Sequence, residues 1–271
     1  KITEPTTPKP WTNYLGNRRL KAFISQKAGG MLWRGDPSTQ RITRYHHSIV
    51  PPGDCPGFYV YIKNRKTGTV WNPHYAPTFT PLDSFACKHS PGITGFEACC
   101  ENIFASVEYT VPTQHDALLM RVTLRNKSRD SVEILAASYL EFGLMEPARE
   151  SWWLCLQYHL ALTWDKKLDA ARYDYHVFEA PQTPFMLFGC TEKADSWDLS
   201  RDAFIGAAGT FANPQALQKG KLSNSELPAG GHGAGIIGKE ISLRPGEEHT
   251  FTYIFSIGDT WREAEECLKF F

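Results

Sequence analysis

Short strand-forming segments, separated by turn residues, recur along this chain and limit the folds open to it. Phe104–Val111 is rich in aromatic and β-branched residues and stops at Pro112, which cannot donate a ladder hydrogen bond. Ala117–Arg125 follows, and the turn residues Asn126–Asp130 separate it from Val132–Phe142. We expect these three segments to pair as an antiparallel meander.

The same pattern continues on both sides of this meander. Phe58–Lys63 and Thr69–Trp71 flank Asn64–Gly68, which is a hairpin signal. Many short strands without intervening helices are typical of a sandwich and not of βαβ units. The sequence therefore predicts an all-β protein, with one large antiparallel β-sandwich over residues 1–258. Its later strands are expected at Phe185–Cys190, Gly235–Leu243 and Thr250–Ile257.

One helix is predicted, over residues 259–271, where the strand pattern ends. Asp259 and Thr260 can cap its first turn, and Glu263 has the spacing of a capping box. Helical periodicity would then place four apolar residues on one face: Ala264, Cys267, Leu268 and Phe271.

Composition excludes some partners and indicates a compartment. The 29 basic and 29 acidic residues cancel, so no global field would recruit nucleic acid or an anionic membrane surface. No signal peptide and no apolar run near the ~20 residues of a membrane span are present in the sequence. The seven cysteines are odd in number and lack a Cys-x-x-Cys pair, which predicts reduced thiols and a cytoplasmic protein.

Motifs for catalysis or for a metal are not found in the sequence. The Gly-rich segment 229–235 has no Lys-Ser/Thr pair and leads into a strand, so we interpret it as a loop and not as a phosphate cradle. His46 and His47 are adjacent and would point to opposite faces of a strand, which does not suit one metal ion. We therefore predict no metal site.

Four charged residues are the most site-like in the strands and loops. Glu141 ends a strong strand, and Asp198, Arg201 and Asp202 lie together in a polar segment. We interpret each as an ion pair or hydrogen bond that orders a loop. A pair of catalytic carboxylates would come from distant positions, and a single sequence does not pair them.

The segment Leu144–Leu160 has the composition of a contact loop. Arg149, Glu150, Trp152 and Trp153 lie close together in it after the strand that ends near Phe142. Trp beside charged residues is typical of a surface that binds a sugar or a partner. Packing of either Trp onto the sandwich is the alternative, and for Trp152 it is the preferred one.

Several segments in order resemble the N-terminal domain of the cellobiose and chitobiose phosphorylase family, glycoside hydrolase family 94. The resemblance extends from Pro10 to the terminal helix and depends on the whole ordered set, since no single motif is decisive. Its segments are Pro10–Gly16, Ala28–Gly30, Pro56–Tyr61, Trp71–Pro73, Tyr139–Phe142, Ser200–Gly206, Asn213–Pro214, Gly220–Ser225 and Leu243–Glu248.

The resemblance implies a galactose-mutarotase-like super-sandwich, followed by a helical linker that starts at residues 259–271 and leads to an (α/α)₆ catalytic barrel. Such enzymes cleave a β-glucosidic bond with inorganic phosphate and invert the anomeric centre, without a metal or an organic cofactor. The general acid, an aspartate, and the phosphate site lie in the barrel. This chain would then hold no catalytic residue and be inactive alone.

The resemblance also implies partners for the sandwich. It would serve as scaffold and homodimer surface, and the loop that starts near Leu144 would reach the active site of the neighbouring subunit. The substrate would be a β-linked oligosaccharide. Two alternatives stay open: a phosphorylase-like module of a cyclic β-glucan synthase, and a free-standing carbohydrate-binding protein.

Overall fold

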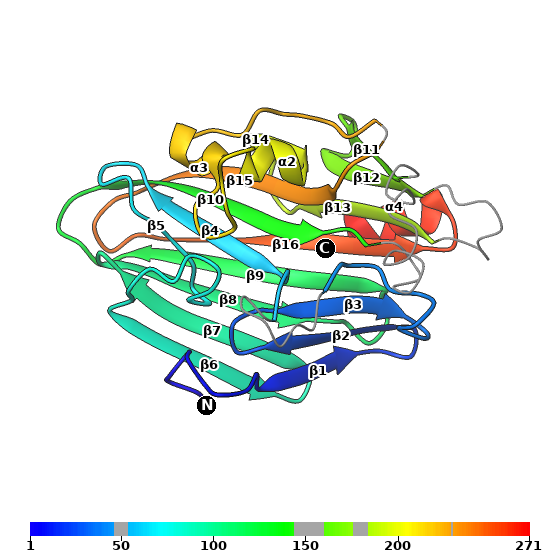
Figure 1. Cartoon of the computed structure of the whole chain (residues 1–271), viewed down its shortest axis with the longest axis horizontal. Coiled ribbons are helices and arrows are strands. Elements are labelled where there is room, and N and C mark those ends of the chain that lie inside the picture. The colour runs from blue at the N-terminus through cyan, green and yellow to red at the C-terminus, as the bar shows by residue number, and fades with distance from the viewer. Residues whose placement is uncertain (46–53, 144–159, 176–183, 229) are drawn as a thin grey trace.

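The computed structural model describes residues 1–45, 54–143, 160–175, 184–228 and 230–271. Three antiparallel sheets and three short helices make up these residues (Figure 1). The predicted contact residues Arg149, Glu150, Trp152 and Trp153 lie outside the described residues.

The largest sheet has eight strands and forms one layer of the sandwich. Its edge at β6 comes from the first half of the chain, whereas its edge at β11 comes from the second half. In spatial order the strands are β11 (Leu160–Asp165), β12 (Ala170–Tyr175), β13 (Phe185–Cys190), β16 (Glu248–Gly258), β9 (Ala117–Asn126), β8 (Ile103–Thr110), β7 (Ile93–Cys100) and β6 (Ser84–Ser90).

The other layer is formed by a five-stranded sheet with a three-stranded sheet beside it (Figure 1). The five strands are, in spatial order, β14 (Ser196–Ser200), β15 (Gly233–Leu243), β10 (Val132–Glu141), β4 (Tyr59–Asn64) and β5 (Val70–Trp71). The three strands are β1 (Thr12–Gly16), β2 (Leu20–Ser25) and β3 (Gly30–Arg34).

The two large sheets pack on one apolar core that is rich in aromatic rings. At one end, the rings of Phe142 and Tyr173 stack with centroids 4.7 Å apart, and the Phe142 ring also packs 5.7 Å from that of Phe255. Near the middle, the Tyr253 hydroxyl of β16 donates a hydrogen bond of 3.0 Å to the Ile237 carbonyl oxygen of β15. A polar atom of one layer thus finds its partner in the opposite layer, which fixes their relative position.

The predicted all-β sandwich is confirmed, and so is the hairpin of β4 and β5. The predicted meander of three is wrong in its third strand: β8 pairs with β9, but β10 pairs with β15 and β4 in the other sheet. The turn after β9 crosses between the layers, and the side-chain amide of Asn126 donates to the Asp130 and Leu243 carbonyls there. Because both sheets bury apolar residues on the same core, the pattern of one strand does not reveal which sheet it joins.

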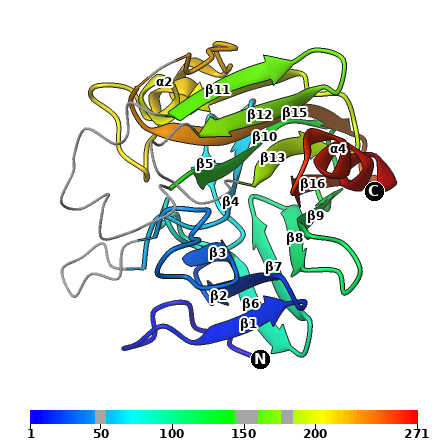
Figure 2. The ribbon, with the colours of Figure 1, turned by 90° about the vertical axis from the view of Figure 1, so that its right-hand side faces the viewer.

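The terminal helix, α4 (Trp261–Phe270), is confirmed together with its Thr260 N-cap, while the Glu263 side chain bonds the residue before the cap. Thr260 Oγ1 accepts from the Glu263 amide at 3.2 Å, and Glu263 accepts from the Asp259 amide at 2.8 Å. Its apolar face packs on the outer side of β13 and β16 (Figure 2), where Leu187 and Ile254 alternate with residues that face the sandwich core.

Two shorter helices, α2 (Arg201–Ile205) and α3 (Gln215–Lys219), were not predicted. With five residues each, they are too short to show helical periodicity. Among the described residues, no helix is long and apolar enough to cross a membrane. The six cysteines that lie in the described ranges form no disulfide.

The Tyr253 hydroxyl gives a test of how the layers are joined. Replacement of Tyr253 by Phe should lower the free energy of unfolding by about 1 kcal/mol, because it removes the interlayer hydrogen bond and keeps the ring. Urea unfolding measures this change. Tyr14→Phe is the matched control, since Tyr14 is 70% exposed, and should leave stability unaltered. Equal effects of the two variants would contradict the assigned role.

Candidate functional site

A buried carboxylate, Glu141, lies at the end of β10 and is held by three side chains. Arg44 Nη1 lies 3.1 Å from Glu141 Oε2, and the Tyr139 hydroxyl donates to Oε1 at 2.6 Å. Arg201, at the start of α2, places its Nε 3.8 Å from Oε1. Glu141 and Arg44 are only 2% and 5% exposed. Burial of an ion pair is tolerated where further hydrogen bonds satisfy its atoms, as they do here.

The arrangement around Glu141 orders the structure and does not suit proton transfer. Both carboxylate oxygens face guanidinium groups, and the side chain has almost no contact with solvent. A general acid must reach the substrate atom that it protonates. The sequence-based interpretation of Glu141 as an ion pair agrees with this geometry. We call Glu141, Arg44, Arg201 and Tyr139 the Glu141 network.

Asp198 and Asp202, the other site-like residues, do not converge on Glu141. Asp198 is fully buried on β14, and its Oδ1 accepts from the hydroxyls of Ser223 and Ser225 at 2.6 and 2.9 Å. Asp202 is exposed beside His232, 3.9 Å from Nδ1. Burial lowers the pKa of His232, and the nearby charges of Arg44 and Arg201 lower it further.

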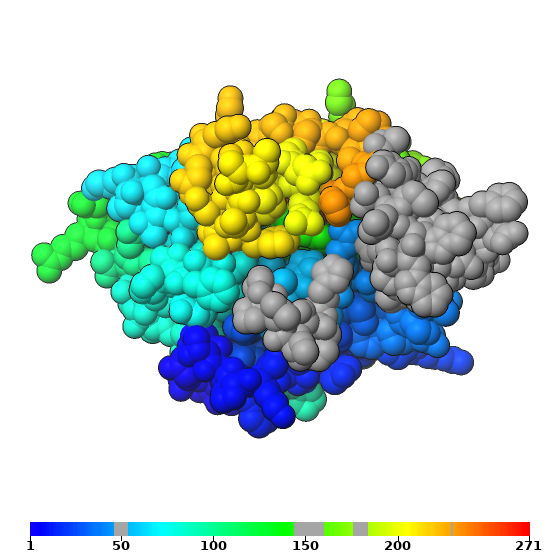
Figure 3. All heavy atoms as spheres, viewed as in Figure 1, coloured from blue at the N-terminus to red at the C-terminus, as the bar shows by residue number. Residues whose placement is uncertain are grey.

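A pocket of about 170 Å³ lies next to the Glu141 network. The ring of Phe211 forms part of its wall and lies 5.2 Å from the Arg201 guanidinium carbon, which connects pocket and network. Tyr59 of β4 lines the pocket floor, with Asp54 and Cys55 beside it. Burial raises the pKa of the Cys55 thiol, and the negative charges of Glu141 and Asp54 add to the effect. Figure 3 shows this face, where the α2–α3 segment in yellow borders the β4–β5 region in cyan.

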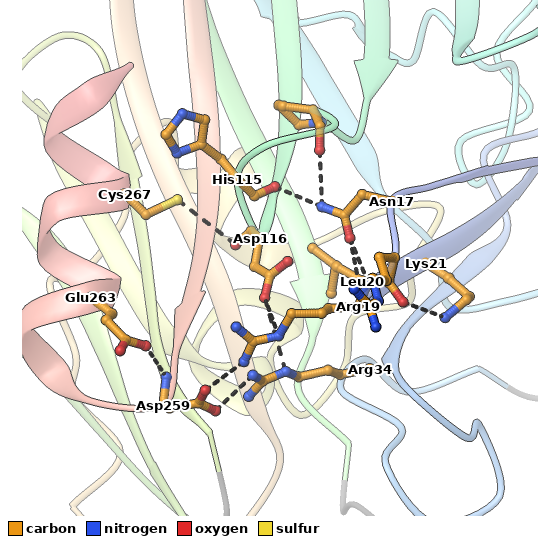
Figure 4. Close-up of polar contacts among 12 residues, drawn as sticks. Asn17, Arg19, Leu20, Lys21, Arg34, His115, Asp116, Asp259, Glu263 and Cys267 are labelled. Atoms are coloured by element: carbon orange, nitrogen blue, oxygen red, sulfur yellow. Dashed lines mark hydrogen bonds and ion pairs between the residues drawn. The ribbon is translucent and has the colours of Figure 1, made fainter.

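A second polar cluster ties the three-stranded sheet to the start of α4 (Figure 4). Arg19 Nη2 and Arg34 Nη2 lie 2.5 and 2.6 Å from the two carboxylate oxygens of Asp259. Arg19 Nε also lies 3.2 Å from Asp116, in the turn before β9. Burial raises the pKa of Asp116, an effect that Arg19 opposes. We call these four residues the α4 clamp.

Other polar groups within the described ranges do not suggest a metal or a catalytic centre. No three His, Cys, Asp or Glu side chains in those ranges gather as a metal site requires. His74 is fully buried, with Nε2 2.7 Å from the Tyr109 hydroxyl, and burial lowers its pKa to about 3. His74 is therefore a neutral core residue. His46 and His47 lie outside the described residues.

Comparison with known proteins identifies the family. Residues 1–271 match the family described as glycosyl hydrolase 94, supersandwich domain. The chain belongs to this family. It is 31% identical to the N,N'-diacetylchitobiose phosphorylase of Vibrio furnissii over 95% of this chain, and 30% identical to the solabiose phosphorylase of Paenibacillus borealis over 99%. The chain spans only 32% and 34% of those two proteins, about a third of each.

More distant similarities agree with the supersandwich fold. The cyclic beta-(1,2)-glucan synthase NdvB of Rhizobium meliloti is 22% identical over 97% of this supersandwich chain, which covers 9% of that protein. A putative aldose 1-epimerase of Escherichia coli K12 superimposes with a TM-score of 0.53 at 12% identity, over 92% of this chain and 99% of the epimerase. A galactose mutarotase related enzyme of Lactobacillus acidophilus superimposes with a TM-score of 0.51 at 11% identity. The match covers 91% of this chain and 97% of that enzyme. The galactose-mutarotase-like fold predicted from the sequence is thus confirmed.

Sequence reasoning missed the pocket and the α4 clamp of this supersandwich domain. The pocket takes residues from five separate segments, and Arg19 and Asp259 are 240 residues apart. No local spacing connects such residues. The one available signal was Arg201, which the sequence singled out and which contacts both the network and the pocket wall.

The Glu141 network should contribute strongly to stability. Glu141→Gln removes the buried anion beside Arg44, and we expect a loss of roughly 3–5 kcal/mol in the free energy of unfolding. Chemical denaturation measures it. Glu240→Gln is the matched control, because Glu240 pairs with Arg65 at the surface, and it should cost less than about 1 kcal/mol. A Glu141→Gln variant as stable as the control would show that burial of the network adds nothing.

Proposed function

We propose that the chain is the non-catalytic N-terminal domain of an inverting β-glucoside phosphorylase of the cellobiose or chitobiose type. One observation supports this proposal: nearly the whole chain is similar to known phosphorylases, but it covers only part of each of them. The chain aligns over nearly all its length with proteins named as phosphorylases, yet it spans about a third of each. The remaining two thirds of such a protein has room for a catalytic (α/α)₆ barrel after the linker helix at residues 259–271.

The chemistry of phosphorolysis accounts for the division of roles. One carboxylic acid protonates the leaving glycosidic oxygen, while phosphate attacks the anomeric carbon from the opposite face. The products are an α-sugar 1-phosphate and a saccharide that is one unit shorter. Neither a metal nor an organic cofactor is needed, and inorganic phosphate is the co-substrate. We propose that the acid and the phosphate site belong to the barrel.

The sandwich would act as scaffold, as homodimer surface and as support for an active-site loop in a cytoplasmic enzyme. Strand β10 supports the last role, because it ends at Glu141, three residues before the segment Leu144–Leu160 begins. The Glu141 network fixes the end of that strand against two other segments. Arg149, Glu150, Trp152 and Trp153 remain the proposed contacts to a β-linked oligosaccharide.

The reaction is testable on the parent protein. Incubation with cellobiose, N,N'-diacetylchitobiose and longer β-glucosides should release a sugar 1-phosphate only when inorganic phosphate is present. Proton and phosphorus NMR would identify the α anomer, because inversion of a β-bond gives the α product. The 271-residue chain alone is the control and should show no turnover. Release of free sugar without phosphate, or no cleavage of any β-glucoside, would reject the proposal.

The contact loop is tested by Trp153→Ala in the parent protein. Loss of a stacking surface for the sugar should lower kcat/KM roughly tenfold, equivalent to about 1.4 kcal/mol, mainly through a higher KM. Steady-state kinetics of phosphorolysis measures it. Trp11→Ala is the matched control, since Trp11 is 63% exposed on the three-stranded side of the sandwich, and it should leave kcat/KM unchanged. Equal kinetics for both variants would place Trp153 away from the substrate.

A phosphorylase-like module of a cyclic β-glucan synthase is the second candidate. The alignment with the Rhizobium meliloti synthase supports it, because it covers 97% of this chain. The chain covers 9% of that protein, so the length of the parent chain separates the two candidates.

A further inference from the structure

The pocket beside the Glu141 network is assembled from parts that are far apart in the sequence. Lys27 follows β2, Asp54 and Cys55 precede β4, and Phe79 belongs to the loop after β5. Residues 210–212, between α2 and α3, complete the wall. Convergence of separate segments on a mostly apolar hollow with a few polar groups is the usual form of a small-molecule site.

The aromatic wall of the pocket is held in place before any ligand arrives. The backbone carbonyl of Phe211 accepts a hydrogen bond of 2.9 Å from the Tyr61 hydroxyl. The ring of Phe211 packs edge-on against the ring of Tyr139, with centroids 5.7 Å apart. On the other side, the ring of Phe79 packs edge-on against Tyr75, 5.6 Å away. Phe79 is nevertheless 48% exposed. A wall that is fixed in this way loses little entropy when a ligand binds.

Two residues of the wall have backbone conformations that side chains rarely adopt. Asp54 has φ of 65° and Phe79 has φ of 54°, both in the left-handed region. Asp is among the residues that tolerate this region, whereas a bulky residue such as Phe79 is strained there and is retained where the surrounding structure or a function requires it. The backbone conformation of Phe79 places its large apolar ring at the surface. Burial of the ring therefore does little to offset the backbone strain.

The polar groups of the pocket are few and varied in charge. Asp54 is buried, and its carboxylate accepts from the Ser25 hydroxyl at 2.5 Å and the Tyr45 hydroxyl at 3.1 Å. Lys27 also lines the pocket and can supply an ammonium group. Thr210 supplies a hydroxyl that accepts from the Asn213 amide and keeps its proton for donation.

This combination favours a neutral ligand with hydroxyl groups and one apolar face. A single ammonium beside a carboxylate does not suit a phosphate, and a single carboxylate does not suit a metal ion. The volume of about 170 Å³ is below the roughly 300 Å³ at which drug-sized sites begin, so one ring fits and an oligosaccharide chain does not. A pyranose has hydroxyls at its edge, which match the charged groups of the pocket. It also has C–H groups on its faces, which match the aromatic rings of the pocket.

We propose that this pocket is a binding site for a single pyranose ring, built from residues of the sandwich itself. The sugar packs a C–H face against Phe79 or Phe211, and its edge hydroxyls bind Lys27, Asp54 and Thr210. This site is independent of the proposed function, because it uses only residues of this chain.

Titration of the 271-residue chain with methyl β-D-glucopyranoside and D-glucose, followed by NMR, tests the proposal. We expect saturable binding with a millimolar dissociation constant, since a small ring makes few contacts. Glycerol, a polyol without a ring, is the control and should not saturate the site. Cys55 gives an independent readout, because its half-buried thiol lines the pocket. Bound sugar should slow its alkylation, measured by peptide mass spectrometry, whereas Cys190 should react at an unchanged rate.

Two variants assign the binding to the pocket. Phe79→Asn removes the exposed ring, and Asn tolerates the left-handed backbone conformation at this position. This variant should bind the sugar at least tenfold more weakly. Lys27→Met removes the ammonium and should weaken binding about fivefold. The matched controls are Phe270→Asn, at an exposed phenylalanine on α4, and Lys21→Met, on the strand that precedes Lys27. Both controls should bind as the unaltered chain does.

Three results would overturn the proposal. These are the absence of saturable binding for both pyranoses, equal binding in pocket and control variants, and no protection of Cys55 at saturating sugar. None of these outcomes depends on whether the parent protein catalyses phosphorolysis. A parent that lacks phosphorolysis while the chain still binds pyranose would reject the proposed function and keep the site.

Discussion

Burial of strand β10 on both of its faces brings a carboxylate into the interior of the domain, and much of the surrounding structure neutralises it. One face of β10 packs on the eight-stranded sheet, and the other is covered by α2 and by the residues 206–213 that follow. Glu141 at the end of this strand requires Arg44 from one segment and Arg201 from another. These two arginines in turn fix the start of α2 and the residues around Thr43, which bridge to Phe142 after β10. The position of the pocket wall at Phe211 depends on the same arrangement, because Arg201 also contacts its ring.

Elements with a strong local signal could be predicted, and arrangements that depend on distant contacts could not. The β4–β5 hairpin and the capped helix α4 follow from turn and capping residues that lie within a few positions of each other. The pairing of β10 with β15 and β4 could not be predicted in this way, because β10 is apolar on both faces and its pattern does not show which sheet it joins. Sequence reasoning selected Glu141 and Arg201 correctly as charged residues that order the structure. It had no means to pair them with Arg44, since no periodicity connects these positions.

The domain has a fold that proteins of very different sequence share, and its loops place particular groups on that fold. Proteins that share the supersandwich fold at identities of 11–12% show that the architecture accommodates very different sequences. Function on such a scaffold depends on the groups that the loops present. In this chain, the loops after β2, before β4 and after β5 meet the α2–α3 segment at one place, and these are the segments that gather aromatic rings and charges.

The α4 clamp has a consequence for the order in which the chain can fold. It joins Arg19 to Asp259 across 240 residues, so the three-stranded sheet at the beginning of the chain acquires these ion pairs only after almost all of the chain has been synthesised. Contacts of such long sequence separation are slow to form because the loop-closure entropy is paid before they stabilise anything. During synthesis, strands β1–β3 would therefore emerge first and remain without their ion pairs until α4 has left the ribosome. Helix α4 thus supplies the last ion-pair partner of the three-stranded sheet.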